Sequence, residues 1–320
     1  MKSTTIFAGV LLALAASTAM ADSYPSRPVR LVVPYPPGGS ADIVARRIVD
    51  EWAKELGASM VVENRAGAGG NIGVDAVAKS PKDGYTIGLQ TVSLAINPSI
   101  FARMPYDTQK DLTAIGTVAS SQHVLVVNNN FPAKNTKELV AAAKASPGKY
   151  SYGSAGSGST FHMSAELFKA VADVDILHVP YKGGGPALID TIGGQVDMSF
   201  PVLSAALQQV QGGKLRAIGV TGPKRSPLMP EVPTLGESGA TGYSFETWFM
   251  VFAPAGTPKP VIDKLNVSLN KVLNDPSLKE RLAKEGIDPT PSSPDQAQAK
   301  LNREMELWAK VVKERGIKAE

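Results

Sequence analysis

Short apolar runs that end in loops of glycine, proline and serine recur along this chain, and a helical pattern follows each loop. Residues 29–33 (VRLVV) have the pattern of a strand and lead into the loop 34–40 (PYPPGGS). Apolar side chains then recur at every fourth residue until a glycine ends the pattern. These positions are Val44, Ile48, Trp52, Leu56 and the terminal Gly57. Strands that alternate with helices of this length predict βαβ units, and hence an α/β fold with a mostly parallel sheet.

The same unit recurs through the middle of the chain. Further strands are predicted at 60–62, 86–90, 124–127, 150–152, 176–179, 196–200 and 215–220, with helices through 74–77, 138–145 and 167–168. The stretch between 90 and 124 has no regular pattern and is expected to be irregular. In the last third, a helix is predicted over 258–273. The final helix is expected to start at a capping box formed by Ser293 and Gln296, with Pro294 at its first position.

The composition is that of a globular protein and excludes several classes of site. Of 320 residues, 43% are hydrophobic and 19% are charged, so the chain can bury a sizeable core. This length predicts about two domains, or one large α/β domain. The 33 basic and 29 acidic residues are interspersed, which argues against a nucleic-acid partner. The chain has no cysteine for disulfides or thiolate chemistry, and its three scattered histidines leave little material for a metal site.

The first 21 residues have the pattern of a secretory signal peptide. Lys2 gives a charged start, residues 6–16 are small and apolar, and residues 19–21 (AMA) form a cleavage site. A membrane anchor is the weaker interpretation, because a spanning helix needs roughly 20 apolar residues. A lipoprotein would need a cysteine at the cleavage point. We therefore predict cleavage after Ala21 and a freely soluble protein in the periplasm.

Two strand–loop–helix junctions carry the residue types of an anion site. The small residues of 36–40 (PPGGS) and 156–160 (GSGST) directly precede predicted helices. A helix N-terminus exposes backbone N–H groups and carries roughly +0.5 charge, so it binds anions. Ligands of open α/β sheets lie beyond the carboxyl ends of the strands, where these loops are expected. Glycine and serine also form ordinary turns and caps, but two such loops in separate halves of an exported chain favour a binding site.

Eight motifs, in order along the mature chain, resemble those of the Bug (Bordetella uptake gene) proteins. This family comprises the solute receptors of tripartite tricarboxylate transporters. The resemblance covers Tyr24 to the C-terminus without an obvious gap. The motifs are PYPPGGSAD (34–42), ENRAGAGGNIG (63–73), DGYT (83–86), INP (96–98), HVPYKGG (178–184), GGQVD (193–197), VPTLGESG (232–239) and APAGTP (253–258).

The resemblance implies a type II periplasmic-binding-protein fold, in which two α/β domains joined by two crossing segments close over a ligand. The crossings are placed near 121–124 and 243–248. This gives a discontinuous domain 1 (22–122 plus 248–320) and a domain 2 (123–247). The implied function is that of a monomeric receptor, without enzyme activity or cofactor. It would capture a small carboxylate, either a di- or tricarboxylate or an aromatic one, and deliver it to the inner-membrane transporter subunits.

In this family the two loops hold one carboxylate through backbone N–H groups, hydroxyls and bridging water. Asp42 is interpreted as an organiser of the first loop, since its charge would otherwise repel the ligand. For Lys182 a cleft-edge role competes with simple exposure to solvent, and for His162 a ligand role competes with packing. Phe161 replaces the polar or small residue common at its position and could favour a flat ligand. The candidate ligand-binding residues are Tyr35, Pro37, Gly38, Gly39, Ser40, Asp42, Thr91, Ser93, Ser154, Gly156, Ser157, Gly158, Ser159, Thr160, His162, Tyr181, Lys182, Phe200 and Trp248.

Two enzyme classes are the alternatives. A nucleotide-binding enzyme would use the glycines of 67–73 (GAGGNIG), but their spacing misses the dinucleotide fingerprint by one residue. A secreted α/β hydrolase would use Ser154 or Ser157 with His162 or His178, but no G-x-S-x-G elbow is present. Stabilisation by a ligand without turnover would distinguish a receptor from both.

Overall fold

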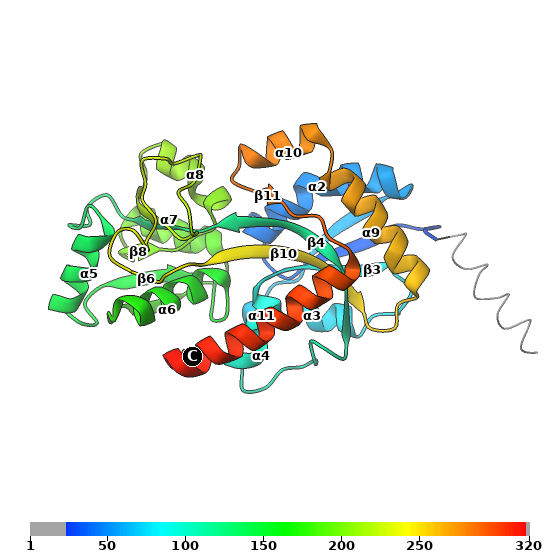
Figure 1. Cartoon of the computed structure of the whole chain (residues 1–320), viewed down its shortest axis with the longest axis horizontal. Helices are drawn as coiled ribbons and strands as arrows, with labels where there is room; N and C mark the ends of the chain where they lie inside the picture. Colours follow the sequence, from blue (N-terminus) through cyan, green and yellow to red (C-terminus); the bar gives the residue numbers. More distant parts are fainter. Residues whose placement is uncertain (1–23, 318–320) are drawn as a thin grey trace, which may run out of the picture.

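The computed structural model describes residues 24–317 and contains two β-sheets flanked by helices (Figure 1). The predicted signal peptide, 1–21, lies outside the described residues. The first sheet has the order β11 (Asp288–Pro289), β4 (Leu112–Gln122), β10 (Glu246–Pro254), β3 (Thr86–Thr91), β1 (Val29–Val33), β2 (Met60–Asn64). The second has the order β7 (Leu177–Pro180), β6 (Ser151–Ser154), β8 (Met198–Ser199), β5 (Val124–Val127), β9 (Arg216–Val220). The predicted α/β class is confirmed.

The first predicted strand–loop–helix unit is confirmed in detail. β1 leads through the loop to α2 (Ser40–Leu56), whose apolar stripe, including Val44, Ile48 and Trp52, is fully buried. Gly57 ends the helix with φ 77°, a left-handed conformation that glycine adopts without steric cost. This burial fixes the direction in which the N-terminus of α2 points.

The expectation of a mostly parallel sheet was wrong, because both sheets are mixed. β1 pairs in parallel with β2 and β3, but β10 runs antiparallel to β3 and β4. In the second sheet, β5 is antiparallel to both β8 and β9. A parallel neighbour needs a long crossover connection. The chain instead passes from one sheet to the other through extended strands: β4 continues through His123 into β5, and β10 returns to the first sheet (Figure 1).

The expectation that the stretch between 90 and 124 is irregular was wrong. This stretch contains α4 (Ser93–Ile100) and β4. Pro98 lies inside α4 and weakens its helical signal. In β4 the small residues Ala114, Gly116 and Ala119 lie where large apolar residues would mark a strand. At Gly116 an added Cβ would lie 2.8 Å from the side-chain amide of Asn266, so the close approach of the next layer requires a small residue.

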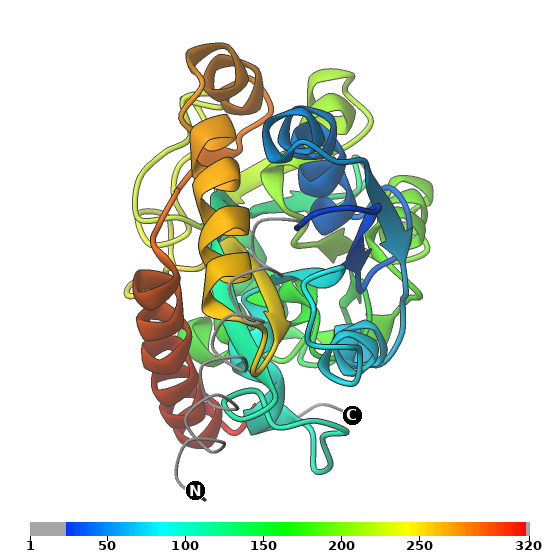
Figure 2. The same cartoon turned by 90° about the vertical axis from the view of Figure 1, so that its right-hand side faces the viewer.

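Helices α9 (Lys259–Leu273) and α11 (Pro294–Arg315) contact β4 and lie along one side of the first sheet (Figure 2). The predicted capping box at the start of α11 is confirmed, with Gln296 N–H donating to Ser293 Oγ at 3.1 Å. No described helix is long and apolar enough to cross a membrane. The remaining helices are η1 (Ala68–Gly70), α3 (Asn71–Ala78), α5 (Thr136–Ala145), α6 (Thr160–Ala172), α7 (Gly184–Gly193), α8 (Leu203–Gln211) and α10 (Pro276–Ala283).

Candidate functional site

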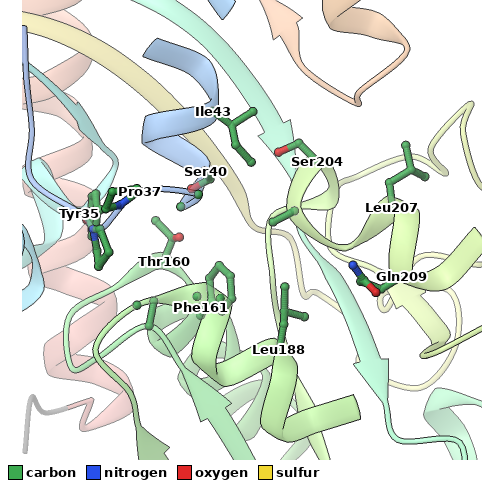
Figure 3. A pocket seen from close by; sticks show the side chains of 18 of the residues that line it. Tyr35, Pro37, Ser40, Ile43, Thr160, Phe161, Leu188, Ser204, Leu207 and Gln209 are labelled. Carbon is green, nitrogen blue, oxygen red and sulfur yellow. The ribbon is translucent and has the colours of Figure 1, made fainter. Parts of the chain in front are cut away.

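A cavity of about 560 Å³ is lined by residues from elements that flank both sheets (Figure 3). Its volume lies in the range of about 300–1,000 Å³ that is typical of small-molecule sites. The first sheet contributes the loop after β1 and the start of α2, together with residues beyond α10. The second contributes the starts of α6 and α7 and one side of α8.

Three helix N-termini meet at this cavity. Gly39 and Ser40 begin α2, Ser159 and Thr160 begin α6, and residues 183–185 begin α7. The first N–H groups of a helix have no partner within the helix. The N-cap residues of α2 and α7 are glycines, so no side chain caps these two described helices. The cavity therefore collects unpaired N–H donors and the positive ends of three helix dipoles, an arrangement that favours an anion.

Asp42 holds the first loop in place through hydrogen bonds and does not line the cavity. Its carboxylate, 2% exposed, accepts hydrogen bonds from Gly38 N–H at 2.9 Å, Arg46 Nε at 3.0 Å and Asn64 Nδ2 at 2.9 Å. Burial alone would raise the pKa of Asp42, but the bonds from Arg46, Gly38 and Asn64 outweigh it and hold that pKa below its usual value. Gly38 has φ +79°, so the tight turn of this loop requires glycine there.

The second loop is held by two buried histidines. Ser154 Oγ lies 2.6 Å from His178 Nε2 and accepts a hydrogen bond from Gly156 N–H at 3.1 Å. Gly158 N–H donates to His162 Nδ1 at 3.2 Å. Burial, together with the neighbouring His178 and a nearby lysine, lowers the pKa of His162 to about 3. His162 is therefore neutral at pH 7 and acts as an acceptor that fixes the loop.

Tyr35 and Thr91 add hydroxyl groups to the cavity wall. Their oxygens lie 3.3 Å apart, and both residues line the cavity. Burial raises the pKa of Tyr35, so its hydroxyl stays protonated and can donate a hydrogen bond. Ser93, by contrast, is fully buried and donates to the carbonyl oxygen of Gly158 at 2.9 Å, which links α4 of the first sheet to the second loop.

The cavity brings together part of the predicted site. Among the predicted residues, its lining includes Tyr35, Pro37, Gly38, Gly39, Ser40, Thr91, Ser159 and Thr160. The others lie outside the lining: Asp42, Ser93, Ser154, Gly156, Ser157, Gly158, His162, Tyr181, Lys182, Phe200 and Trp248. Phe200 and Trp248 are core side chains, 1% and 4% exposed. Tyr181 donates to Asp190 at 2.7 Å, and Lys182 is exposed.

The N-terminus of α7 and most of the cavity wall were not predicted from the sequence. Residues 183–185 (GGG) follow the strand β7, which is the same strand–glycine–helix pattern that marked the other two loops. The wall residues Ile43, Leu188 and Leu207 lie on helices, and no local motif distinguishes them from core positions.

The Ser–His pair that a hydrolase would need is present, but it is not accessible from the cavity. Ser154 Oγ is within hydrogen-bond distance of His178, yet Ser154 is fully buried and neither residue lines the cavity. Within residues 24–317, no group of three or more histidine, aspartate or glutamate side chains is placed to hold a metal ion.

The chain contains two mixed β-sheets that are joined by extended strands, and a cavity bordered by helix N-termini lies between their flanking elements. This is the fold of periplasmic binding proteins. The model of the tripartite tricarboxylate transporter family receptor matches residues 44–317 of this chain. The chain belongs to this family, and the resemblance to the Bug proteins is confirmed.

Individual relatives agree with this assignment. The chain is 38% identical to the protein BugT of Bordetella pertussis over 314 residues, which is 97% of this chain and 96% of BugT. Its structure is similar to that of R. palustris Rpa4515 with adipate (36% identity, TM-score 0.89, covering 92% of this chain and 99% of the other). It is also similar to that of MatC from Rhodopseudomonas palustris with bound malate (31% identity, TM-score 0.86, covering 90% and 100%).

Proposed function

We propose that this protein captures a small carboxylate in the periplasm and delivers it to the inner-membrane subunits of a tripartite tricarboxylate transporter. The observation that carries the proposal is the convergence of the N-termini of α2, α6 and α7 on one cavity. Two relatives whose structures hold adipate and malate support a carboxylate as the ligand.

The carboxylate binds at the three N-termini, where the N–H groups of Ser40, Thr160 and Gly184 donate to its oxygens. The hydroxyls of Thr91 and Thr160 add further donors from the cavity wall. Hydrogen bonds to a charged group each contribute roughly 1.5–3 kcal/mol. No ion pair is needed, and Lys182 stays in solvent.

The two sheets form the cores of two domains that close over the ligand. The proposed boundaries are 22–122 plus 248–320 for one domain and 123–247 for the other, with the crossing segments at 121–124 and 243–248. Support comes from the strand content of the sheets, since β5 to β9 all lie within 124–220. The chain acts as a monomer and is exported by a signal peptide cleaved after Ala21. It binds its ligand without chemical turnover.

A thermal-shift screen of a carboxylate library against the mature protein tests the proposal. A ligand at 100 times its dissociation constant adds about 2.7 kcal/mol of stability. We expect at least one carboxylate to raise the melting temperature and to be recovered unchanged after incubation. A shift with sugars or nucleotides and with no carboxylate would refute the proposal.

A further inference from the structure

Beyond the three helix N-termini, the cavity has an apolar wall. Ile43, Phe161, Leu188 and Leu207 line it, and Figure 3 shows that they come from different helices around the same space. The Phe161 ring packs directly against Gly184, where an added Cβ would lie 2.8 Å from the ring. The Phe161 side chain is 3% exposed, so close packing holds its ring at the cavity wall.

All charged side chains of the described lining are already paired. Arg47 Nε lies 2.8 Å from Glu285 Oε1, and this pair joins α2 to the segment after α10. Lys284 pairs with Glu280 at 2.8 Å on the exposed side of α10. A second carboxylate on this side of the cavity would have to compete with Glu285 for Arg47 and with Glu280 for Lys284.

The other polar groups on this side of the cavity are neutral. Ser204, Gln208 and Gln209 line it from α8. The Ser204 hydroxyl is buried and has no partner among the described residues, so it suits an uncharged polar substituent of a ligand. A second carboxylate would exchange its hydration for neutral donors alone, the Ser204 hydroxyl and the amides of Gln208 and Gln209, and burying a charge without a compensating cation is unfavourable. An apolar group, by contrast, gains from burial against the ring and the leucines.

Resting on the proposed function, we infer that the preferred ligand is a monocarboxylate with an apolar body. The carboxylate occupies the three helix N-termini, and the body lies against Phe161 and Leu188. The ion pair of Arg47 and Glu285 selects against ligands that carry a second carboxylate at the end opposite the first one.

Hexanoate and adipate form a matched pair of probes, since they share a six-carbon chain and differ by one carboxylate. Calorimetry should show hexanoate binding at least tenfold more tightly than adipate, and citrate binding more weakly than either. Tighter binding of adipate or citrate would overturn this inference and leave the proposed function intact. Binding of none of the three, together with no carboxylate hit in the thermal-shift screen, would remove the proposed function itself.

Freeing Arg47 provides a second, gain-of-function test. Glu285→Gln removes the partner of Arg47 and should raise adipate affinity at least fivefold, with hexanoate affinity changed less than twofold. Glu51→Gln is the matched control, because it frees Arg281 in a neighbouring ion pair between α2 and α10, at residues that do not line the cavity. Unchanged adipate affinity in a folded Glu285→Gln variant, or an equal gain in Glu51→Gln, would show that this pair does not exclude a second carboxylate.

Discussion

The imidazole ring of His123 joins the two extended segments that pass between the sheets. Its Nε2 lies 2.6 Å from Oγ1 of Thr247 in β10, and its Nδ1 lies 2.7 Å from the carbonyl oxygen of Phe200. A carbonyl only accepts, so Nδ1 carries the proton and Nε2 accepts from the Thr247 hydroxyl. Burial lowers the pKa of His123 to about 4, although the bond to Phe200 opposes this shift. The ring is therefore neutral at pH 7.

This neutral state predicts a loss of stability in mild acid. The unfolded chain binds protons at its histidines below their usual pKa of about 6.5, while folded His123 and His162 resist protonation until about pH 4 and 3. The free energy of unfolding should therefore fall from pH 7 to pH 5, by about 2 kcal/mol for each histidine. Urea unfolding at the two pH values measures this change.

The control for this prediction is His162→Gln, which removes one of the two groups. The variant should lose only about half as much stability between pH 7 and pH 5 as the unmodified protein. A stability that does not change over this interval would contradict the assignment of both rings as neutral.

Substitutions at the cavity should separate binding by helix N-termini from binding by an ion pair. Thr160→Val keeps the shape of the side chain and the helix start but removes a hydroxyl from the cavity wall. Its expected cost in affinity is roughly 1.5–3 kcal/mol. Lys182→Met should cost less than about 1.4 kcal/mol, because this lysine is exposed and lies outside the lining. Calorimetry that ranks the two variants in the opposite order would mean that a salt bridge holds the anion.

The hydrogen bond from Ser93 to Gly158 connects elements of the two sheets and should stabilise the closed arrangement. Ser93→Ala should weaken ligand binding by about 1 kcal/mol. Ser238→Ala provides the matched control, since its hydroxyl donates locally to Thr234 at 2.7 Å. Equal affinities of the two variants would show that the Ser93 bond is not coupled to binding.

Closure should also be visible in solution. Gly183 has φ +128°, and an added Cβ would lie 2.9 Å from Cγ of Pro36 in the opposite loop. Small-angle scattering should show a smaller radius of gyration when a bound carboxylate is present, because closure is a hinge motion. In Gly183→Ala this compaction and the affinity should both decrease. Gly193→Ala, in the same helix with open space around it, should behave like the unmodified protein. A radius that ligand leaves unchanged would exclude the hinge.

The sequence predicted best what local chemistry determines. The β1–loop–α2 unit follows from an apolar stripe and a terminal glycine, and the start of α11 follows from its capping box. The position of β10, antiparallel between β3 and β4, could not be predicted from local sequence patterns, because strand direction depends on how the chain crosses between the sheets. The residues of the cavity wall could not be predicted either, because in the sequence Leu188 and Leu207 have the same pattern as core residues. Three of the predicted serines also lie outside the lining: Ser93, Ser154 and Ser157.

The position of β10 between β3 and β4 has a consequence for how the chain acquires its structure. The inner strands of the first sheet cannot complete their pairing until residue 254 is available, whereas the strands β5 to β9 pair with one another within residues 124–220. Contacts over long sequence separations form late, because the intervening chain must first be ordered. While the chain is being made from its N-terminus, the second sheet can therefore assemble before the edges of β3 and β4 are paired. Such edges are prone to aggregation. The order of assembly therefore leaves these two edges exposed until the last third of the chain is available.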